Sequence, residues 1–574
     1  MSYFKLFLTS LAVASWLAVG DPGTDPANGA APVVVEARQP GSSALDVVQT
    51  VTAPLEKALR GMEDVRRISS LSLEGRCFVR LELETSANSK KVREAVARRL
   101  TDAAPTLPEA CVRLGVQLLP EASPSFFVVA LRASSQREPT ELSRLARDSI
   151  RPRLQRVPSV SQVHILGQAN EQVRIVCDPN RLIAYDLPAA DVLSALRKLS
   201  KRPPENVGEL GDAVVATRNS VPILVRDLAV VEIGVQQSGV AGLALRKDKR
   251  GLEIAEPLVL LVVQPLPGNI EDFGKSLDMA LKDIEHLLPG VRLDQRLFRP
   301  SAMTAALRLP PGTKLEERAR IARTVAETSL RVPQLQAVYW MAPAASDEVL
   351  LLPWPTAAKG ADLRTDLRSV LSELGELKGV GIRVGGLRSP LLSWPGESSQ
   401  LVTRVSGDDI DELRKTADQV HARMSKIEGI VDLDRAWETV PQLTVDLDLE
   451  KCARMGLNMT DVMQILRMYQ GGLEVEGLKI AGRPAVLMLP GPLTKTPFDL
   501  RELRVRNIKS QWVTLDTVAE ARVLVVPQSL YRDAGKLCIV VSCNIHGRNV
   551  ANVRDDIRKA VQELSRREAR IELE

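Results

Sequence analysis

The sequence contains no long run of apolar residues beyond its N-terminus. Of its 574 residues, 45% are hydrophobic and 26% are charged, which is the balance of a globular chain. A membrane-spanning helix needs about 20 consecutive, mainly apolar residues, and no later stretch comes near that length. The composition therefore argues against a multi-span or disordered protein, and the length predicts several domains.

The sequence also lacks a large excess of charge of either sign. Lysine and arginine total 76 against 71 aspartate and glutamate residues, so the net charge is only +5. The basic residues form no long run, and the electrostatic footprint of a nucleic-acid-binding protein is absent. We expect no nucleic-acid partner.

Residues that carry catalysis or bind metals are few and scattered. The four histidines lie far apart, and the six cysteines form no CxxC pair. The glycine-rich stretch Gly379–Gly386 lacks phosphate-binding spacing and is predicted to be a strand between turns. The sequence thus predicts no enzyme activity, no cofactor and no metal site. The cysteines are interpreted as buried apolar residues, with any disulfide pairing left open; they are Cys77, Cys111, Cys177, Cys452, Cys538 and Cys543.

The N-terminus carries the one membrane-type signal. Fourteen uncharged residues, Leu6–Val19, follow Lys5. This length matches the apolar core of a signal peptide, and Ala18-Val19-Gly20 provides a cleavage site. Residues 1–22 are therefore interpreted either as a cleaved leader or as a membrane anchor formed by residues 4–20. Both interpretations predict that the chain is exported.

Two segments of the chain repeat each other. Residues 173–197 and 443–467 share a pattern in which every matched pair differs by 270 in number. This constant register predicts an internal duplication. The matched residues Asp178 and Asp448 each end a predicted strand, and we expect each to fix either a turn or a domain junction.

Hydrophobic periodicity divides each half into strands and helices. Residues 33–38, 77–83 and 126–131 have strand patterns, and apolar residues recur at helical spacing between them. The order β-α-β-β-α-β is repeated, which predicts an α+β chain of tandem ferredoxin-like subdomains in two duplicated halves. The predicted helices are 42–62, 90–100, 140–156, 315–330, 363–374 and 411–424.

Several sequence motifs follow one another along the chain in a characteristic order. They are VTAPLEKAL (51–59), VRRISS (65–70), RLPPGTKLEERARIA (308–322), the pattern of residues 443–462, LDTVAEARV (515–523) and NIHGRN (544–549). In order and spacing they resemble the periplasmic regions of the resistance-nodulation-division (RND) efflux permease family (AcrB/CusA-like). The resemblance covers roughly residues 33–574.

The resemblance implies four porter subdomains with inserted docking subdomains. The implied boundaries are 33–120 for porter subdomain 1, 121–178 with 240–296 for 2, 300–390 for 3, 399–448 with 535–574 for 4, 179–239 for a reduced docking subdomain and 449–534 for a fuller one. It also implies a trimer of the periplasm and inner membrane. The implied partners are a membrane permease chain, an adaptor and an outer-membrane channel.

The chain departs from the family pattern between its two halves. In the family a bundle of membrane helices separates the halves, whereas residues 286–295 run directly into 296–313 here. Without intramembrane carboxylates there is no group to couple proton movement to transport. We therefore expect a porter and docking protein that acts as a subunit or accessory of a transport assembly. The alternatives are a periplasmic ligand-binding module and a degenerate transporter remnant.

Drug-type members of the family bind apolar substrates in an aromatic-lined cleft between porter subdomains. Only 3% of this sequence is aromatic, which argues against a rich multidrug pocket. The resemblance and the strand pattern select four candidates for lining the cleft, namely Phe78, Phe127, Tyr339 and Trp340. Strand alternation should place about half of such side chains in the core instead. The methionines near residues 455–468 follow helical spacing and are interpreted as packing residues rather than soft-metal ligands.

Overall fold

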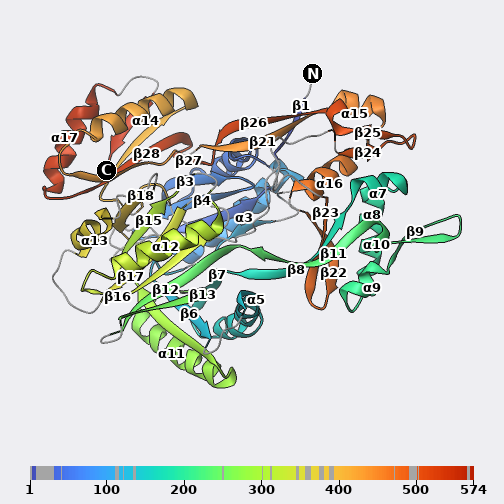
Figure 1. Ribbon diagram of the computed structural model, residues 1–574. Helices are drawn as coiled ribbons and strands as arrows, with labels where there is room; N and C mark the ends of the chain where they lie inside the picture. The colour runs from blue at the N-terminus through green and yellow to red at the C-terminus, as the bar shows by residue number, and fades with distance from the viewer. Residues whose placement is uncertain are drawn as a thin grey trace. The chain divides into compact units, whose positions relative to one another are not determined.

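The described part of the chain contains both strands and helices in the computed structural model, and the α+β prediction is confirmed (Figure 1). The structure describes residues 3–7, 32–39, 42–109, 111, 115–120, 122–133, 138–247, 251–299, 302–310, 313–343, 348–355, 363–373, 380–386, 394–397, 399–437, 439–470, 472–489, 501, 503–564 and 569–574. The chain divides into two units. The insert unit comprises residues 1–12, 169–236 and 440–526, and the sheet unit comprises 13–168, 237–439 and 527–574.

The first subdomain of the sheet unit has the strand order β3-β4-β2-β5. Its elements are β2 (Val33–Arg38), α1 (Ala44–Val47), the π-helical turn η1 (Val48–Thr52), α2 (Ala53–Leu59), β3 (Val65–Leu73), β4 (Arg76–Leu83), α3 (Ser89–Ala103) and β5 (Val116–Leu118). Helix α3 starts where Asn88 accepts a hydrogen bond from the Lys91 amide. Its predicted apolar face, Val92, Val96 and Leu100, is buried against the sheet.

The second subdomain repeats this arrangement with an interruption. Its elements are β6 (Phe126–Ala133), α5 (Pro139–Arg144), η3 (Leu145–Ile150), α6 (Arg151–Leu154), β7 (Val160–Leu166), β13 (Gly251–Pro265), α11 (Ile270–Leu287) and β14 (Val291–Phe298). Strands β14, β6, β13 and β7 pair in that order. The insert unit interrupts this subdomain between β7 and β13.

The third and fourth subdomains form the second half. The third holds β15 (Met303–Arg308), α12 (Leu315–Ser329), β16 (Leu335–Pro343), β17 (Glu348–Pro355), α13 (Leu363–Ser372) and β18 (Gly381–Gly386). The fourth holds β19 (Leu401–Gly407), α14 (Ile410–Met424), β20 (Ile430–Arg435), β28 (Lys536–Ile545), α17 (Val550–Gln562) and β29 (Ala569–Leu573). Each repeats the strand order of its counterpart in the first half.

Two β-hairpins join the halves reciprocally. Strand β12 (Gly239–Lys247) pairs with β13 of its own half and with β16 of the other half. In the same way β27 (Ser529–Asp533) pairs with β28 and with β3 of the first subdomain. The result is two nine-stranded sheets, one shared by the second and third subdomains and one by the fourth and first.

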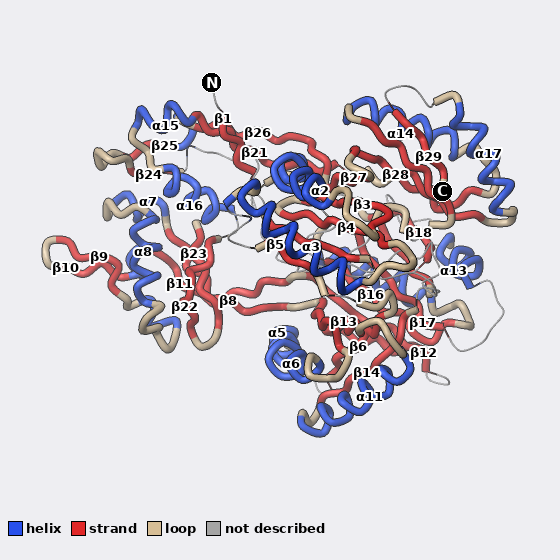
Figure 2. Tube along the Cα trace, turned by 180° about the vertical axis from the view of Figure 1, so that it is seen from behind, coloured by secondary structure: helices blue, strands red, loops and turns tan. Residues whose placement is uncertain are grey.

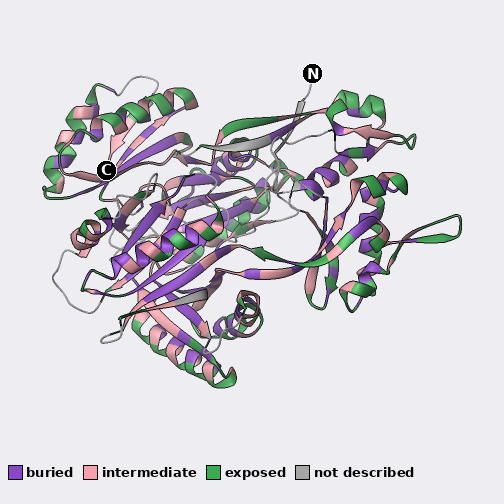
Figure 3. Cartoon of the chain, viewed as in Figure 1, coloured by how far each residue is buried: buried purple, intermediate pink, exposed green. Residues whose placement is uncertain are grey.

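Each nine-stranded sheet is buried on both faces. One face packs against helices, whose inner sides are buried while their outer sides are exposed (Figure 3). The opposite face carries a hydrophobic cluster to which no described helix contributes. Because successive residues of a strand point to opposite faces, β13 is apolar on both faces over residues 258–263 rather than alternating with polar residues.

The insert unit is built from matching parts of the two halves. The first half supplies β8 (Ala169–Cys177), α7 (Pro179–Ala184), α8 (Ala189–Leu199), α9 (Val207–Gly211), β9 (Val214–Arg218), β10 (Val221–Leu224), α10 (Val225–Leu228) and β11 (Ala229–Gln237). The second supplies β21 (Thr439–Asp448), α15 (Leu449–Met455), α16 (Met459–Gln470), β22 (Leu473–Ile480), β23 (Arg483–Met488), β24 (Arg504–Arg506), β25 (Trp512–Thr514), η6 (Leu515–Thr517) and β26 (Ala519–Pro527).

Pairing across the halves also holds the insert unit together. Strand β23 of the second half runs parallel to β8 of the first, which extends the sheet β11-β8-β23-β22. The hairpin β9–β10 forms a separate two-stranded ribbon (Figure 2). The expected roles of Asp178 and Asp448 are seen here, because each ends a strand and accepts backbone hydrogen bonds at the start of α7 or α15.

Some predictions concern residues that the structure leaves undescribed. Most of the predicted leader lies outside the described residues, and only Tyr3–Phe7 is placed, as β1 antiparallel to β21. Gly379 is likewise outside them, whereas Gly381–Gly386 forms a strand as predicted. The predicted helices 42–62 and 140–156 are present but contain π-helical turns over Val48–Thr52 and Leu145–Ile150.

The β12–β16 pairing predicts the effect of a single methyl group. Gly242 lies opposite Trp340, and an added Cβ would sit 1.9 Å from the indole Cζ2. Gly242→Ala should therefore lower the free energy of unfolding by about 1–3 kcal/mol, the usual cost of overpacking. Gly381→Ala is the control, because its Cβ would meet only Arg308 Cβ at 3.7 Å. Denaturant unfolding monitored by circular dichroism checks this, and equal stability of both variants would contradict it.

Candidate functional site

The helix-free face of the sheet shared by the second and third subdomains carries a group of aromatic rings. Phe126 on β6 stacks on Phe298 of β14 with ring centroids 5.7 Å apart. Phe298 also meets Tyr339 of β16 at 6.2 Å and Trp354 of β17 at 5.4 Å, both edge-on. We call these four residues the aromatic cluster. They come from both halves of the chain and meet only because β12 joins the two subdomains into one sheet.

Polar groups without partners lie on the same face. The Tyr339 hydroxyl and both amide atoms of Gln264 are buried and have no hydrogen-bond partner among the described residues. Burial raises the pKa of Tyr339 above its usual range, so the phenol stays protonated and can donate. Arg296 lies over the Trp354 ring at 5.9 Å. Buried polar atoms of this kind ordinarily meet ordered water or a ligand.

The sheet shared by the fourth and first subdomains carries a second, smaller group. Trp394 and Tyr531 meet edge-on at 6.4 Å, and both belong to the hydrophobic cluster that contains Phe78. The Arg80 guanidinium lies 5.7 Å from the Trp394 ring. Burial raises the pKa of Tyr531 to about 12. The two helix-free faces thus have related chemistry, as expected for duplicated halves.

The structure does not bring the four sequence-predicted cleft residues together. Tyr339 joins the aromatic cluster, but the adjacent Trp340 points to the opposite face and packs under α12. Phe127 lies beneath the helices of the second subdomain, 5.4 Å from Phe273. Phe78 sits on the helix-free face of the other sheet. Their contact with a substrate stays a prediction.

Sequence reasoning missed Phe298 and Trp394. Phe298 ends β14 and pairs with Phe126 through a strand register that links distant parts of the chain. Trp394 lies between secondary-structure elements, where no periodicity marks its direction. The only signal in the sequence was their size and scarcity, since large aromatic residues in a chain poor in them tend to be buried.

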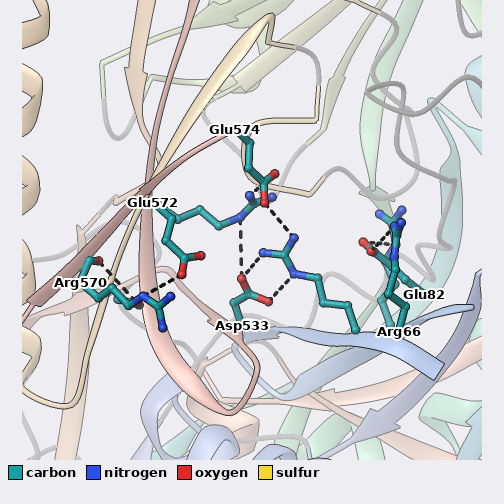
Figure 4. A network of polar contacts seen from close by, with 10 residues as sticks. Arg66, Glu82, Asp533, Arg570, Glu572 and Glu574 are labelled. Carbon is teal, nitrogen blue, oxygen red and sulfur yellow. Dashed lines mark hydrogen bonds and ion pairs between the residues drawn. The ribbon is translucent and has the colours of Figure 1, made fainter. Parts of the chain in front are cut away.

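An ion-pair network ties the first and fourth subdomains together (Figure 4). The Arg67 guanidinium on β3 donates to Asp533 of β27 at 2.8 Å and to Glu574 at 2.9 Å. Arg404 of β19 also pairs with Glu574. Although burial opposes ionisation, hydrogen bonds from Arg404 and Arg67 hold the pKa of Glu574 below its usual range. The network therefore reinforces the joint that the β27 hairpin makes between the halves.

A comparable joint lies within the insert unit. The Asp186 carboxylate accepts hydrogen bonds from Arg218 and Arg506, both at 3.0 Å, and from the Trp512 indole at 3.1 Å. Asp186 has a left-handed backbone, with φ of 49°. Hydrogen bonding to Arg218 is the main cause that lowers the pKa of Asp186. This carboxylate links the first-half and second-half parts of the unit.

Three of the four methionines near residues 455–468 are placed as packing residues. Met468 is fully buried, and Met459 and Met463 pack against the hydrophobic core of the insert unit. Met455 is exposed, so the packing interpretation is wrong for this residue. The six cysteines are all buried and unpaired with one another. The other placements agree with the interpretation of both residue types as apolar side chains.

The sequence matches one protein family in both of its halves. The profile of the AcrB/AcrD/AcrF family matches twice, over residues 26–304 and 300–567. The chain belongs to the AcrB/AcrD/AcrF family. The double match confirms the internal duplication and the RND resemblance. Members of this family are transporters of the cell envelope and not enzymes.

Related sequences include metal and multidrug transporters. The cobalt-zinc-cadmium resistance protein CzcA of Cupriavidus metallidurans is 28% identical over 291 residues, covering 45% of this chain and 26% of CzcA. The multidrug resistance protein MdtF of Escherichia coli K12 is 25% identical over 252 residues, covering 39% of this chain and 24% of MdtF. The matched region thus spans about a quarter of each relative's length.

A solved structure shows the same fold. The crystal structure of a heavy metal efflux pump, crystal form II, superposes with a TM-score of 0.80 at 16% identity, covering 99% of this chain and 80% of that one. None of the helices within the described residues is both long enough and apolar enough to cross a bilayer.

His164 makes the stability of the sheet unit depend on pH. Its ring Nε2 lies 2.8 Å from Gln162 Oε1, and burial, with a smaller effect of Arg151, lowers its pKa to about 4. An unfolded histidine titrates near 6.5. Between pH 6.5 and 4 the unfolded state therefore binds a proton that the folded state does not, so stability falls as the pH falls.

Substitution of His164 by glutamine should weaken this pH dependence. We expect the melting temperature of His164→Gln to fall less between pH 7 and pH 5 than that of the unsubstituted protein. His286→Gln is the control, because His286 is exposed and its imidazole is hydrated in both states. Differential scanning fluorimetry at the two pH values checks this. Parallel curves for the unsubstituted protein and His164→Gln would rule it out.

Proposed function

We propose that this chain is the porter and docking part of an RND-type efflux assembly, in which it acts as a subunit or accessory. The observation that carries the proposal is the double family match over the two halves whose hairpins pair reciprocally. The four β-α-β-β-α-β subdomains would be ferredoxin-like porter subdomains. The insert unit would supply the docking subdomains, at 179–239 and 449–534.

The short connection between the halves supports an assembly in which the periplasmic parts and the membrane helices belong to different chains. Strand β14 ends at Phe298 and β15 begins at Met303, so residues 299–302 alone link them. In the RND pattern this is the position of a membrane-helix bundle. We infer that the proton-coupled helices of the assembly at this position belong to another polypeptide, which this chain would meet in the periplasm or at the inner membrane.

The other proposed partners follow from the family pattern. An adaptor and an outer-membrane channel would meet the insert unit, and a homotrimer would be the functional form. Export by residues 1–22, as a leader or as an anchor at 4–20, would bring the chain to the periplasm.

An apolar compound with a polar group is the proposed substrate class. The aromatic cluster offers ring faces, while Tyr339 and Gln264 offer buried hydrogen-bonding atoms without partners in the described structure. Ligand sites commonly combine an apolar lining with a few such polar groups. Tyr339 is thus retained as a proposed substrate contact and Phe78 as a counterpart on the other sheet. Trp340 and Phe127 are better explained as core residues.

The same polar groups favour a second candidate, a periplasmic ligand-binding module without a transport partner. Both candidates use the aromatic cluster and differ in assembly. Crosslinking of intact cell envelopes, followed by purification of the chain and mass spectrometry, separates them. Recovery of a permease chain, adaptor or channel supports the transport assembly. Recovery of the chain alone, with a small molecule that raises its melting temperature, supports the binding module.

Removal of the Tyr339 hydroxyl should reduce efflux or ligand binding without lowering the stability of the protein. A buried hydroxyl without a partner costs free energy, so Tyr339→Phe should leave the melting temperature unchanged or raise it by a few degrees. If the hydroxyl contacts substrate, the same variant should reduce efflux-dependent resistance or ligand binding about tenfold. Thr444→Val is the control, because Thr444 carries another buried hydroxyl without a described partner, but lies in the insert unit. Unchanged efflux and binding in Tyr339→Phe would remove Tyr339 from the proposed site.

A further inference from the structure

Strands β18 and β20 lie side by side at the junction of the third and fourth subdomains. They belong to different nine-stranded sheets, and β18 is the last strand of its sheet. Within the described residues no main-chain ladder joins them, since β18 pairs with β15 and β20 pairs with β28. Among the described residues, the contacts that hold this junction closed therefore come from side chains.

A β-bulge in β20 directs one side chain across the junction. The register with β28 shifts between Val431 and Asp434, and Asp432 within the bulge has a left-handed φ of 50°. Aspartate adopts this conformation only at some cost, and bulges commonly redirect a side chain. The strained backbone turns the Asp432 carboxylate toward β18.

The Asp432 carboxylate is almost fully enclosed by partners from the third subdomain and from β28. It accepts hydrogen bonds from the Val384 amide at 3.3 Å and from Asn544 Nδ2 at 3.1 Å. The Arg368 guanidinium of α13 pairs with it and also donates to the Val384 carbonyl at 2.8 Å. Asn544 donates to that same carbonyl at 3.2 Å. One backbone position of β18 is thus bound through both its N–H and its C=O.

Asp434 provides a second contact on the same strand. Arg308 of β15 donates to its carboxylate at 3.1 Å, and Arg383 of β18 also pairs with it. Arg383 in turn donates to Glu348 of β17 at 2.7 Å. The two acids of β20 are therefore held by three arginines of the third subdomain.

The first half lacks this arrangement at the matching positions. Under the repeat offset of 270, Asp432 and Asp434 correspond to Gln162 and His164 of β7. These two side chains bond to each other at 2.8 Å. Acidic residues thus stand at only one of the two equivalent places, which argues that they are not a requirement of the shared fold.

We propose that Asp432 and Asp434 form a latch that holds the third and fourth subdomains together and whose release lets the two nine-stranded sheets separate at β18 and β20. Ionic contacts suit a latch, because they have discrete made and broken states and water can replace them when the junction opens. The main-chain ladders within each sheet remain intact during this motion. The relevance of the latch to efflux rests on the proposed function, whereas its existence does not.

Hydrogen–deuterium exchange of the purified full chain tests the latch directly. Asp432→Asn keeps the size of the side chain, but places an amide N–H₂ or a neutral oxygen against the donors Arg368 and Asn544. We expect backbone exchange in residues 381–386 and 430–435 to become about tenfold faster or more, with the rest of both sheets unchanged. Asp556→Asn in α17 is the control, since it removes the exposed ion pair between Asp556 and Arg548, whose atoms lie 2.8 Å apart.

Two results would overturn the latch. One is exchange at β18 and β20 that matches the unsubstituted protein. The other is acceleration spread evenly over both sheets, which would mean that Asp432 supports global stability only. A double variant, Arg368→Gln with Asp432→Asn, should accelerate exchange at the junction by less than the sum of the two single effects, because the two side chains share one ion pair although each has a further partner. Additive effects would also contradict it. These measurements need no transport partner, so failure of the proposed function leaves their outcome unaffected.

Discussion

Main-chain pairing between the two halves is the constraint on which the rest of the sheet unit depends. Strand β12 of the first half completes a sheet with the third subdomain, and β27 of the second half completes one with the first subdomain. Neither half can bury the edges of its sheets alone, and exposed edges of apolar strands are prone to wrong pairing. The duplicated halves are therefore expected to fold as one cooperative body.

This pairing also creates the candidate site. Because each sheet is shared by two subdomains, aromatic residues from both halves meet on its helix-free face, as Phe126, Phe298 and Tyr339 do. The Tyr339 hydroxyl and the Gln264 amide, which have no partners among the described residues, lie on this face as well. Ionic side chains add to these contacts: Arg67 reinforces the backbone-paired joint between β3 and β27, and Asp432 links β18 and β20, which no described ladder joins. Backbone ladders therefore hold each sheet together, whereas side-chain contacts join the two sheets at β18 and β20.

Elements with a clear period were predicted from the sequence almost to the residue. The strand expected at 33–38 is β2, and the apolar spacing of Val92, Val96 and Leu100 is the buried face of α3. The site was less predictable. Tyr339 and Trp340 are neighbours in one strand, so alternation requires that they face opposite ways, but it does not say which face is helix-free. Phe298 was missed because its place in the aromatic cluster depends on its pairing with Phe126 of β6, a strand distant in the sequence.

The sequence by itself determined the α+β class, the duplication and the family, because these follow from local periodicity, from a repeat with constant offset and from ordered motifs. Only the tertiary structure decided which aromatic rings meet, since that depends on the register of strands brought together from distant parts of the chain. It also decided the roles of the acids on β20. Nothing in the sequence around Asp432 and Asp434 distinguishes them from acidic residues on a protein surface. Their meaning comes from a bulge and from arginines of another subdomain, and such long-range electrostatic contacts leave no periodic trace in a single sequence.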